Sequence, residues 1–343
     1  MTRILVGWTV VTSMVVIVGL SKVLPPPWIN SIYGSWVYPT LERILAPAMG
    51  GFSPSLSAVL LTALVPLAVT WSLLRIRRRP SRVLLVATAS AAGIGAWFYL
   101  VWGFNYQRPP LEHFLPLSPK MEAEADLVPL AQALAALIAE EVSAEEDVGA
   151  AVSAIATSLE EITLSWTGSV ISLPRRTKAL PEGLLLTFGF AGVISPFLLE
   201  AHHDGGLPPA AVVAVGAHGL AHIAGFAREA EAEFAAAAAG LRADHPYARY
   251  AVALSQLDRI LPALPRGVQA EVRDTLSDRA IADLTHRRES ARRYLRPGLA
   301  GPLTTVYDRY LRVQGVARDY DRASLLLVRA WEAGLVQLGS GLE

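Results

Sequence analysis

The sequence predicts a mostly α-helical protein, in which three N-terminal transmembrane helices carry a mainly helical domain outside the cytoplasm. Composition predicts the membrane part, because 52% of the 343 residues are hydrophobic and only 17% are charged, whereas soluble domains carry about a quarter charged residues. The other observation is that three long apolar runs lie within the first 103 residues. We therefore divide the chain into a membrane anchor, residues 1–103, and an extracytoplasmic domain, residues 104–343.

The three apolar runs are Ile4–Leu20, Leu56–Leu74 and Val83–Gly103. Each has about the 20 residues that a helix needs to cross the hydrocarbon core, and aromatic residues lie near the ends of the second and third runs, as they do at membrane interfaces. The first run could instead be a cleaved signal peptide, but no small-residue cleavage site follows it. A buried helix of a soluble protein is the other reading of each run, and three such runs so close together disfavour it.

Five arginines predict the orientation of the anchor. They lie in the short segment RIRRRPSR between the second and third runs: Arg75, Arg77, Arg78, Arg79 and Arg82. Short loops this basic stay in the cytoplasm. This predicts a cytoplasmic N-terminus, an external loop over Lys22–Ser55 and an external C-terminal domain. The chain is expected to be a multi-pass protein of the inner or plasma membrane, with the lipid bilayer as a partner.

The external domain reads as helices joined by turns rich in proline and glycine. Pro109-Pro110 favours an extended exit from the membrane, and Pro208-Pro209 fits the first turn of a helix. We expect a surface loop over residues 169–183, and the apolar stretch 183–200 could hold a short strand. Helices are also expected over residues 122–164 with a break near 145–148, over 247–261, over 267–294, and over about 302–334 with a break at Gly315.

Charge and motif content exclude several classes of function. Lys+Arg and Asp+Glu number 30 each, so the net charge indicates neither a nucleic-acid nor an acidic partner. The basic helix 285–296 is better explained by solvent or lipid headgroups than by nucleic acid. The chain has no phosphate loop, dinucleotide fingerprint or G-x-S-x-G elbow, so no nucleotide site is predicted. A transporter is disfavoured because no span carries an internal acid or base. Since cysteine is absent, any metal must be held by His, Asp or Glu.

One stretch, AHGLAHIAGFAREAEAEF, carries a pattern typical of metal sites. His218 and His222 are four residues apart, which puts them on one face of a helix, and Gly225 suits the turn that ends it. The next helix carries Glu229 and Glu233, again four apart. Two histidines and a carboxylate are the protein ligands of one class of catalytic zinc site, and the second glutamate could orient a ligating histidine.

Chance remains the alternative explanation of this pattern. Histidine pairs at this spacing arise in alanine-rich helices, and glutamates on a neighbouring helix are usually solvated. Two features favour a metal site. The histidines lie in a long apolar stretch, where an unpaired imidazole is costly, and the order of histidines, glycine turn and glutamates matches the zinc-peptidase plan.

Five separated blocks of the chain resemble a family of uncharacterised bacterial membrane proteins, defined by a domain of unknown function. The blocks are WGFNYQRPP, GFAGVISPFLLEA, AHGLAHIAGFAREAEAEF, HPYARYAVAL and VYDRYLRVQGV, and together they span nearly the whole chain. Members of that family carry about three N-terminal spans and an outer domain with an H-E-x-x-H zinc-peptidase-like motif. The resemblance therefore implies a zincin-like outer domain.

The helix pair of that family is similar to gluzincin peptidases of the prenyl-protein-protease type, in which a glutamate on the second helix is the third ligand. On this chain the resemblance implies zinc held by His218, His222 and Glu229, with Glu233 as the acid that supports a ligating histidine. Glu231 is the alternative ligand, although it faces another side of the helix because successive residues are about 100° apart.

Gly219 departs from the family pattern. The family has a glutamate there, which takes a proton from the attacking water, and a general base contributes about 10²–10⁴-fold in rate. Glu200 is a weak candidate for a substitute, with His202 and His203 close behind it, although a polar loop over Glu200–His203 is the preferred reading.

Two functions remain open at this point. The first is a membrane-anchored zinc metallopeptidase-like protein whose hydrolysis is weak or lost, with a peptide or an envelope protein as its partner. The alternative is a non-catalytic envelope interaction or structural protein with a degenerate metal site.

Overall fold

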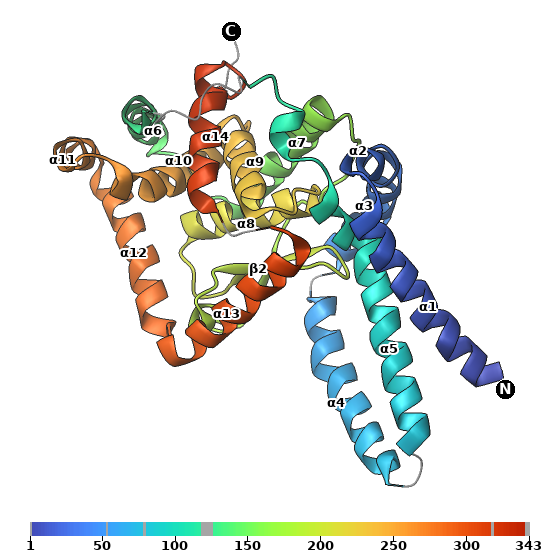
Figure 1. Ribbon diagram of the computed structural model, residues 1–343. Coiled ribbons are helices and arrows are strands. Elements are labelled where there is room, and N and C mark those ends of the chain that lie inside the picture. Colours follow the sequence, from blue (N-terminus) through green and yellow to red (C-terminus); the bar gives the residue numbers. More distant parts are fainter. Residues whose placement is uncertain (1, 53, 78–79, 118–125, 317–318, 340–343) are drawn as a thin grey trace.

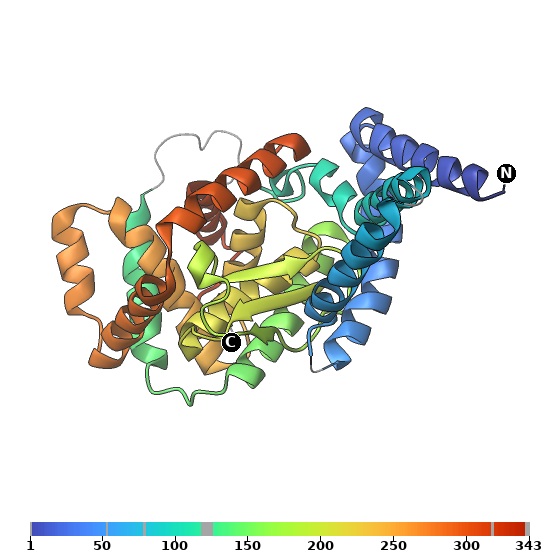
Figure 2. The same ribbon diagram turned by 90° about the horizontal axis from the view of Figure 1, so that it is seen from below.

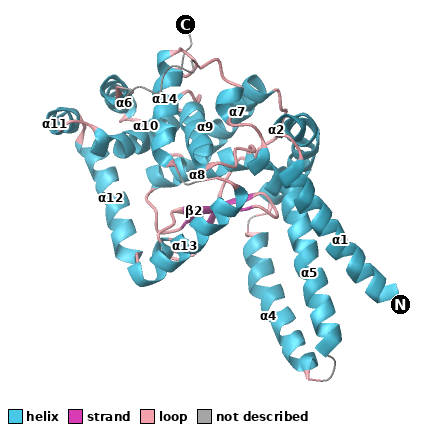
Figure 3. Ribbon diagram, viewed as in Figure 1, coloured by secondary structure: helices cyan, strands magenta, loops and turns pink. Residues whose placement is uncertain are grey.

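The computed structural model describes residues 2–52, 54–77, 80–117, 126–316 and 319–339. Most of these residues are helical, and a small three-stranded sheet accompanies the helices (Figure 3). This confirms the prediction of a mostly α-helical chain. In Figure 1, a set of long helices projects from one side of a globular domain that the rest of the chain forms.

The projecting helices are α1 (Thr2–Val23), α4 (Leu56–Ile76) and α5 (Pro80–Val101) (Figure 1). By length and composition, α4 and α5 are the described helices that could cross a membrane, and their apolar windows are 0% and 11% buried, unlike core helices. In α1, the fully described part is Thr9–Val23, which is shorter than a span. The described chain thus has two candidate spans rather than the three predicted. Arg78 and Arg79 of the predicted cytoplasmic loop lie outside the described residues.

The segment between α1 and α4, predicted only as an external loop, is helical. Here α2 (Pro26–Ile29), the π-helix η1 (Asn30–Val37) and α3 (Tyr38–Gly51) follow one another without a gap, and we call this segment the rod. Its buried side chains, Ile29, Tyr33, Tyr38 and Ala46, belong to the hydrophobic core of the outer domain. In space, therefore, part of the sequence assigned to the anchor packs with the domain that begins at residue 104.

Two short 3-10 helices, η2 (Gly103–Gln107) and η3 (Leu111–His113), lead from α5 into the domain. The helix predicted over residues 122–164 is two helices, α6 (Leu127–Glu141) and α7 (Val148–Thr167), so the predicted break is confirmed. Asp147 begins α7, because its carboxylate accepts the Ala150 N–H at 2.8 Å, which is the usual role of a helix-capping aspartate. The start of the prediction, Glu122, lies outside the described residues.

The sheet consists of β1 (Lys178–Leu180), β2 (Gly192–Ser195) and β3 (Glu200–Asp204), in the order β1-β3-β2. Strand β3 is parallel to β1 and antiparallel to β2, and Ser195 pairs with Glu200. The polar-loop reading of residues 200–203 is therefore wrong. The polar side chains of this strand are paired inside the protein rather than hydrated, so their sequence has no apolar alternation to indicate a strand. The short helix η4 (Leu186–Phe188) precedes β2.

Helix α8 (Pro209–Ile223) lies at the centre of the domain, against β2 and β3 on one side and α7, α9 and α10 on others. Every residue of α9 (Glu229–Leu241) is buried, which its alanine-rich sequence permits because small side chains let neighbouring helices approach closely. Helix α10 (Pro246–Ile260) packs against both of them. Seen from below, the strands lie in the middle of this domain (Figure 2).

The C-terminal part contains η5 (Leu261–Ala263), α11 (Arg266–Asp274), α12 (Asp278–Tyr294), α13 (Pro297–Gln314) and α14 (Tyr320–Glu332). The helix predicted over residues 267–294 is thus interrupted, and Ser277 begins its second half by accepting the Ala280 N–H at 3.3 Å. The predicted break at Gly315 is confirmed, since α13 ends there. Helix α13 crosses the domain next to the sheet (Figure 1).

Candidate metal centre

The end of α8 presents His218 and His222 side by side and orients the second of them. Gly225 has a φ of +100°, and its N–H and that of Phe226 bond back to the carbonyls of His222 and Ala221, at 2.8 and 3.3 Å. This is the hydrogen-bond pattern of a Schellman turn. The turn brings the Phe226 carbonyl to 2.8 Å from His222 Nδ1. Because a carbonyl only accepts, Nδ1 carries the hydrogen and the Nε2 lone pair is available to a ligand.

Glu229, the first residue of α9, completes a triangle of potential ligand atoms. His218 Nε2 lies 3.1 Å from His222 Nε2 and 3.2 Å from Glu229 Oε2, and His222 Nε2 lies 3.7 Å from the same oxygen. Zinc binds such atoms at about 2.0–2.1 Å in a tetrahedron, whose corners are then about 3.3 Å apart. The three separations bracket that value, so these atoms could hold one ion.

Glu233 lies one turn beyond Glu229 and contacts the far side of His218. Its Oε2 is 3.1 Å from His218 Nδ1, while its Oε1 accepts from Gln256 at 2.8 Å and lies 2.8 Å from a guanidinium nitrogen of Arg259. Although burial raises the pKa of Glu233, its bond with His218 and the charge of Arg259 lower it to about 2. An ionised Glu233 thus keeps the hydrogen of His218 on Nδ1 and turns Nε2 toward Glu229.

The balance of charge in this group favours a cation. Burial lowers the pKa of His218, but its hydrogen bonds to Glu229 and Glu233 outweigh burial and raise the pKa to about 10. Burial also raises the pKa of Glu229, yet the two histidines hold it well below its usual range. The two carboxylates are thus balanced by Arg259, which pairs with Glu233, and by the proton on His218; a divalent ion bound here would release that proton.

Aromatic residues from distant parts of the chain surround these ligands. Tyr307 of α13 donates its hydroxyl hydrogen to Glu229 Oε1, and Trp102 stands edge-on to His222, with ring centres 6.1 Å apart. The sequence-based prediction lacks both residues. The signal for them was present, because Trp102 lies in the block WGFNYQRPP and Tyr307 in VYDRYLRVQGV.

Glu231, the alternative ligand, points elsewhere. Its Oε1 accepts the Leu111 N–H at 3.0 Å and bonds to Arg228 at 2.8 Å. Arg228 also donates to the Arg108 carbonyl at 2.7 Å. This pair at the start of α9 therefore holds the segment that follows α5, rather than joining the histidines.

At Gly219, α8 touches the sheet. A Cβ atom on this glycine would lie 3.0 Å from the Cβ of Ala201 in β3 and 3.9 Å from a methyl carbon of Ile194 in β2. Unstrained carbon atoms are about 3.5–4.0 Å apart. Helix and strand are thus already in contact where the related motif has its glutamate, and a larger side chain would require β3 to move.

Glu200 fixes the start of α4, one of the two candidate spans. Its buried carboxylate accepts the N–H groups of Leu56 and Ser57 at the start of α4, at 3.1 and 2.8 Å, and forms an ion pair with Lys178. Burial raises its pKa, but these bonds lower it further than burial raises it. Among the described contacts, none joins Glu200 to His218, His222 or Glu229. His202 bonds to Ser55 at 2.8 Å.

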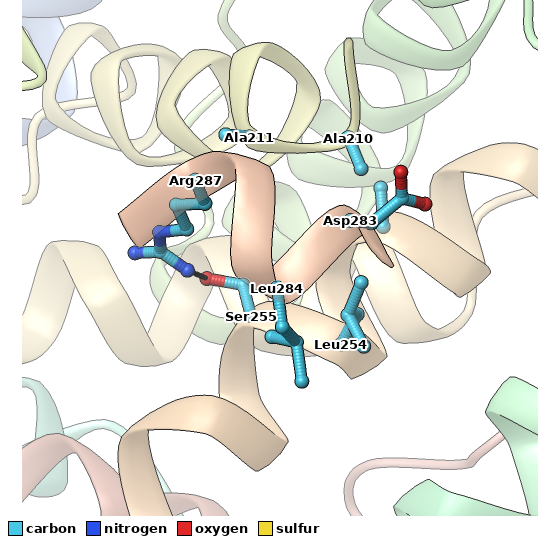
Figure 4. A pocket seen from close by; sticks show the side chains of 8 residues that line it. Ala210, Ala211, Leu254, Ser255, Asp283, Leu284 and Arg287 are labelled. Carbon is cyan, nitrogen blue, oxygen red and sulfur yellow. Dashed lines mark hydrogen bonds between the residues drawn. The ribbon is translucent and has the colours of Figure 1, made fainter. Parts of the chain in front are cut away.

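A separate small cavity lies between α8, α10 and α12 (Figure 4). Its polar lining includes Asp283, Ser255 and Arg287, and Arg287 donates to Ser255 at 3.1 Å. The cavity volume is about 10 Å³, which is no more than the space of one water molecule. It therefore offers no room for a substrate.

Comparison with known proteins gives one match. A family model described as "Protein of unknown function (DUF3810)" matches residues 33–328. No curated protein and no solved structure matches the chain. The matched region begins within η1 and ends within α14, so it includes most of the rod, both candidate spans and all the residues of the cluster described above.

Proposed function

We propose a function for this chain, which belongs to the DUF3810 family of proteins of unknown function: it is a membrane-anchored, zinc-binding protein with a zinc-peptidase-like site, whose hydrolytic activity is weak or lost. The family assignment carries no activity of its own, so the proposal rests on the chemistry of the site. A zincin-like outer domain, three spans and a cytoplasmic N-terminus are parts of the same proposal.

One observation carries the metal assignment. His218 Nε2, His222 Nε2 and Glu229 Oε2 lie 3.1, 3.2 and 3.7 Å apart, close to the spacing of three corners of a zinc tetrahedron. Two further contacts support the assignment, because the other nitrogen of each histidine lies next to an oxygen: that of His222 bonds to the Phe226 carbonyl at 2.8 Å, and that of His218 lies 3.1 Å from Glu233 Oε2. Such supports orient ligating histidines in zinc proteins.

The chain's own residues also define what the site lacks. Bound zinc would supply Lewis-acid chemistry to a carbonyl and lower the pKa of a water. His218, His222 and Glu229 would hold the ion, and Tyr307 would fix the carboxylate of Glu229. Gly219 has no side chain to accept the proton of an attacking water, and that deficit alone corresponds to about 10²–10⁴-fold in rate.

A second candidate function is a non-catalytic envelope interaction or structural protein with a degenerate metal site. The contact between Gly219 and Ala201 favours it, because a Cβ at position 219 would lie 3.0 Å from the Cβ of Ala201, so a base there could enter only if strand β3 yielded. In this case a bound ion would stabilise the packing of α8 against α9. A peptide or envelope protein would then bind without being cleaved.

Zinc content tests the metal assignment. The full-length protein would be purified from membranes in detergent with zinc present, and its zinc measured by mass spectrometry. We expect about one zinc per chain, retained in the control His286→Ala, whose histidine is exposed on α12, and lost in His218→Ala. A zinc-free protein, or equal zinc in the two variants, would refute the site.

Peptide cleavage separates the two functions. The purified protein would be compared with a variant carrying Gly219→Glu and Ala201→Gly, in which the second change makes room for the new side chain. Cleavage of a mixed peptide library by this variant and not by the original chain would support a peptidase-like site that lacks only its base. A zinc-loaded variant that cleaves nothing would favour the non-catalytic alternative.

A topology reporter fused after Glu343 tests the orientation. Five arginines lie between Leu74 and Val83 and predict that this short loop is cytoplasmic. We expect the reporter to be active only outside the cytoplasm. A cytoplasmic signal would contradict the proposed topology without bearing on the zinc site.

A further inference from the structure

The rod has an apolar outer face that no described part of the chain covers. Trp28, Ile32, Trp36 and Ile44 are 63%, 58%, 74% and 64% exposed. Trp28, Ile32 and Trp36 follow one another at four-residue intervals, which places each on the same side of the rod as the next, and Ile44 is exposed further along, in α3. Large apolar side chains exposed in a row of this kind mark an interaction surface rather than a random surface.

The inner face of the rod is fixed to the outer domain. Tyr38 donates its hydroxyl hydrogen to the Ile223 carbonyl at the end of α8, at 2.6 Å. Asn30 accepts from Arg108 at 3.0 Å, and the buried carboxylate of Glu42 accepts the Ser172 N–H at 2.9 Å. The rod is therefore a rigid part of the domain, and its apolar outer face cannot turn inward without breaking these bonds.

The position of the rod in the chain identifies what covers that face. Only residues 24 and 25 separate it from α1, and only residues 52–55 separate it from α4, a candidate span. In Figure 1, α2 and α3 lie on the side of the domain where α1 and α5 join it. Because only four residues separate the rod from α4, the rod must remain close to the lipid surface if α4 crosses the bilayer.

The chemistry of the face agrees with this location. Tryptophan is enriched where the hydrocarbon meets the headgroups, and a helix with an apolar face can lie in that region with this face turned toward the acyl chains. Residues 26–51 contain only two charged side chains. One of them, Glu42, is buried, and the other, Arg43, bonds to the Pro39 carbonyl at 3.1 Å. The outer face is thus suited to lipid rather than to an ionic partner.

We propose that the rod is an interfacial helix that seats the outer domain on the bilayer surface, with Trp28, Ile32, Trp36 and Ile44 in the boundary between headgroups and acyl chains. This inference rests on the proposed membrane placement of α4 and is independent of the zinc site. Because the rod bonds directly to the end of α8, it holds the His/Glu cluster at a constant height above the membrane.

Spin labelling tests the proposal, and the absence of cysteine from the chain makes single labels straightforward. The full-length protein would carry a nitroxide at Trp36→Cys or at Ile44→Cys, in liposomes of phosphatidylcholine and phosphatidylglycerol. Leu67→Cys in α4, 68% exposed, is the lipid reference. Glu161→Cys in α7, with 58% of its side chain exposed, is the aqueous reference. The measurement is accessibility to oxygen compared with a water-soluble nickel chelate.

We expect the labels at positions 36 and 44 to be more accessible to oxygen than to the nickel chelate, as the label at position 67 is. Their depth in the bilayer should be smaller than that of the label at 67. If these two labels match position 161 while 67 stays in lipid, the interfacial rod is refuted and the membrane anchor stands. If the label at position 67 is also as accessible to nickel as the label at 161, both the interfacial rod and the membrane anchor are refuted. Spin–spin broadening at 36 in lipid-diluted samples would show that a second copy of the chain covers the face, which would also overturn the proposal.

Discussion

Substituting Gly225 by alanine tests whether the turn at the end of α8 prepares His222 for metal. A residue other than glycine at a φ of +100° costs about 1–3 kcal/mol in strain. In addition, the new Cβ would lie 3.0 Å from a guanidinium nitrogen of Arg108 and 3.1 Å from a ring carbon of Tyr38. Rotation of the turn relieves both the backbone strain and these contacts, and it moves the Phe226 carbonyl away from His222 Nδ1.

The size of the effect follows from that single hydrogen bond, which is 2.8 Å long. Loss of the group that orients a ligating histidine lowers metal affinity by about 10–100-fold, or about 1.4–2.7 kcal/mol. The assay is competition for zinc between the purified protein and a chelator of known affinity. We expect the dissociation constant for zinc to rise in Gly225→Ala by that factor.

Gly168→Ala is the matched control. Gly168 ends α7 with a φ of +69°, and a Cβ there would meet nothing within 4 Å. This variant therefore adds backbone strain without a clash and without touching the cluster, and it should bind zinc as the original chain does. Equal zinc affinity in both variants, or an equal loss in both, would show that the Phe226 carbonyl does not orient His222.

Two further predictions concern the sheet. Glu200→Gln removes the charged partner of a buried ion pair and leaves Lys178, which also donates to the Pro54 carbonyl, without a counter-charge. The free energy of unfolding should therefore fall by about 3–5 kcal/mol while zinc content is unchanged. A fall of less than about 1 kcal/mol would contradict the pairing. Burial raises the pKa of Asp204, but four backbone N–H groups hold it below its usual range. A lowered folded-state pKa adds stability that is lost as pH falls below about 4. The melting temperature of Asp204→Asn should therefore fall less steeply with decreasing pH in this range than that of the original chain. Equal slopes for the two proteins would refute this prediction.

Local patterns in the sequence were sufficient for the features that depend on local spacing. The four-residue interval of His218 and His222 implies a shared helix face, and Gly225 implies the end of that helix, because both follow from the geometry of a single turn. The breaks after α6 and at Gly315 are likewise local. The functional roles of His218 and His222 stay predictions, since zinc binding is a property that only measurement can establish.

Features that depend on contacts across the chain were not predictable in this way. Tyr307 reaches Glu229 from 78 residues away, and no local pattern signals such a contact. Strand β3 has the polar sequence EAHHD, because its side chains are paired with Lys178, Ser55 and backbone groups of other segments. The helices of the rod were not predicted for a related reason. Its apolar residues lie both on the face that packs against the domain and on the exposed face, so they do not form the single apolar stripe that indicates a surface helix.

The contact of Gly219 with Ala201 also has a historical consequence. A mutation that placed glutamate at position 219 would put its first side-chain carbon 3.0 Å from the Cβ of Ala201, a contact closer than unstrained carbon atoms make. The order of events then matters: a glutamate at 219 meets this contact while position 201 is alanine, and avoids it where position 201 has already become glycine. In descendants of this chain, substitutions at positions 219 and 201 are therefore expected to occur together more often than either alone.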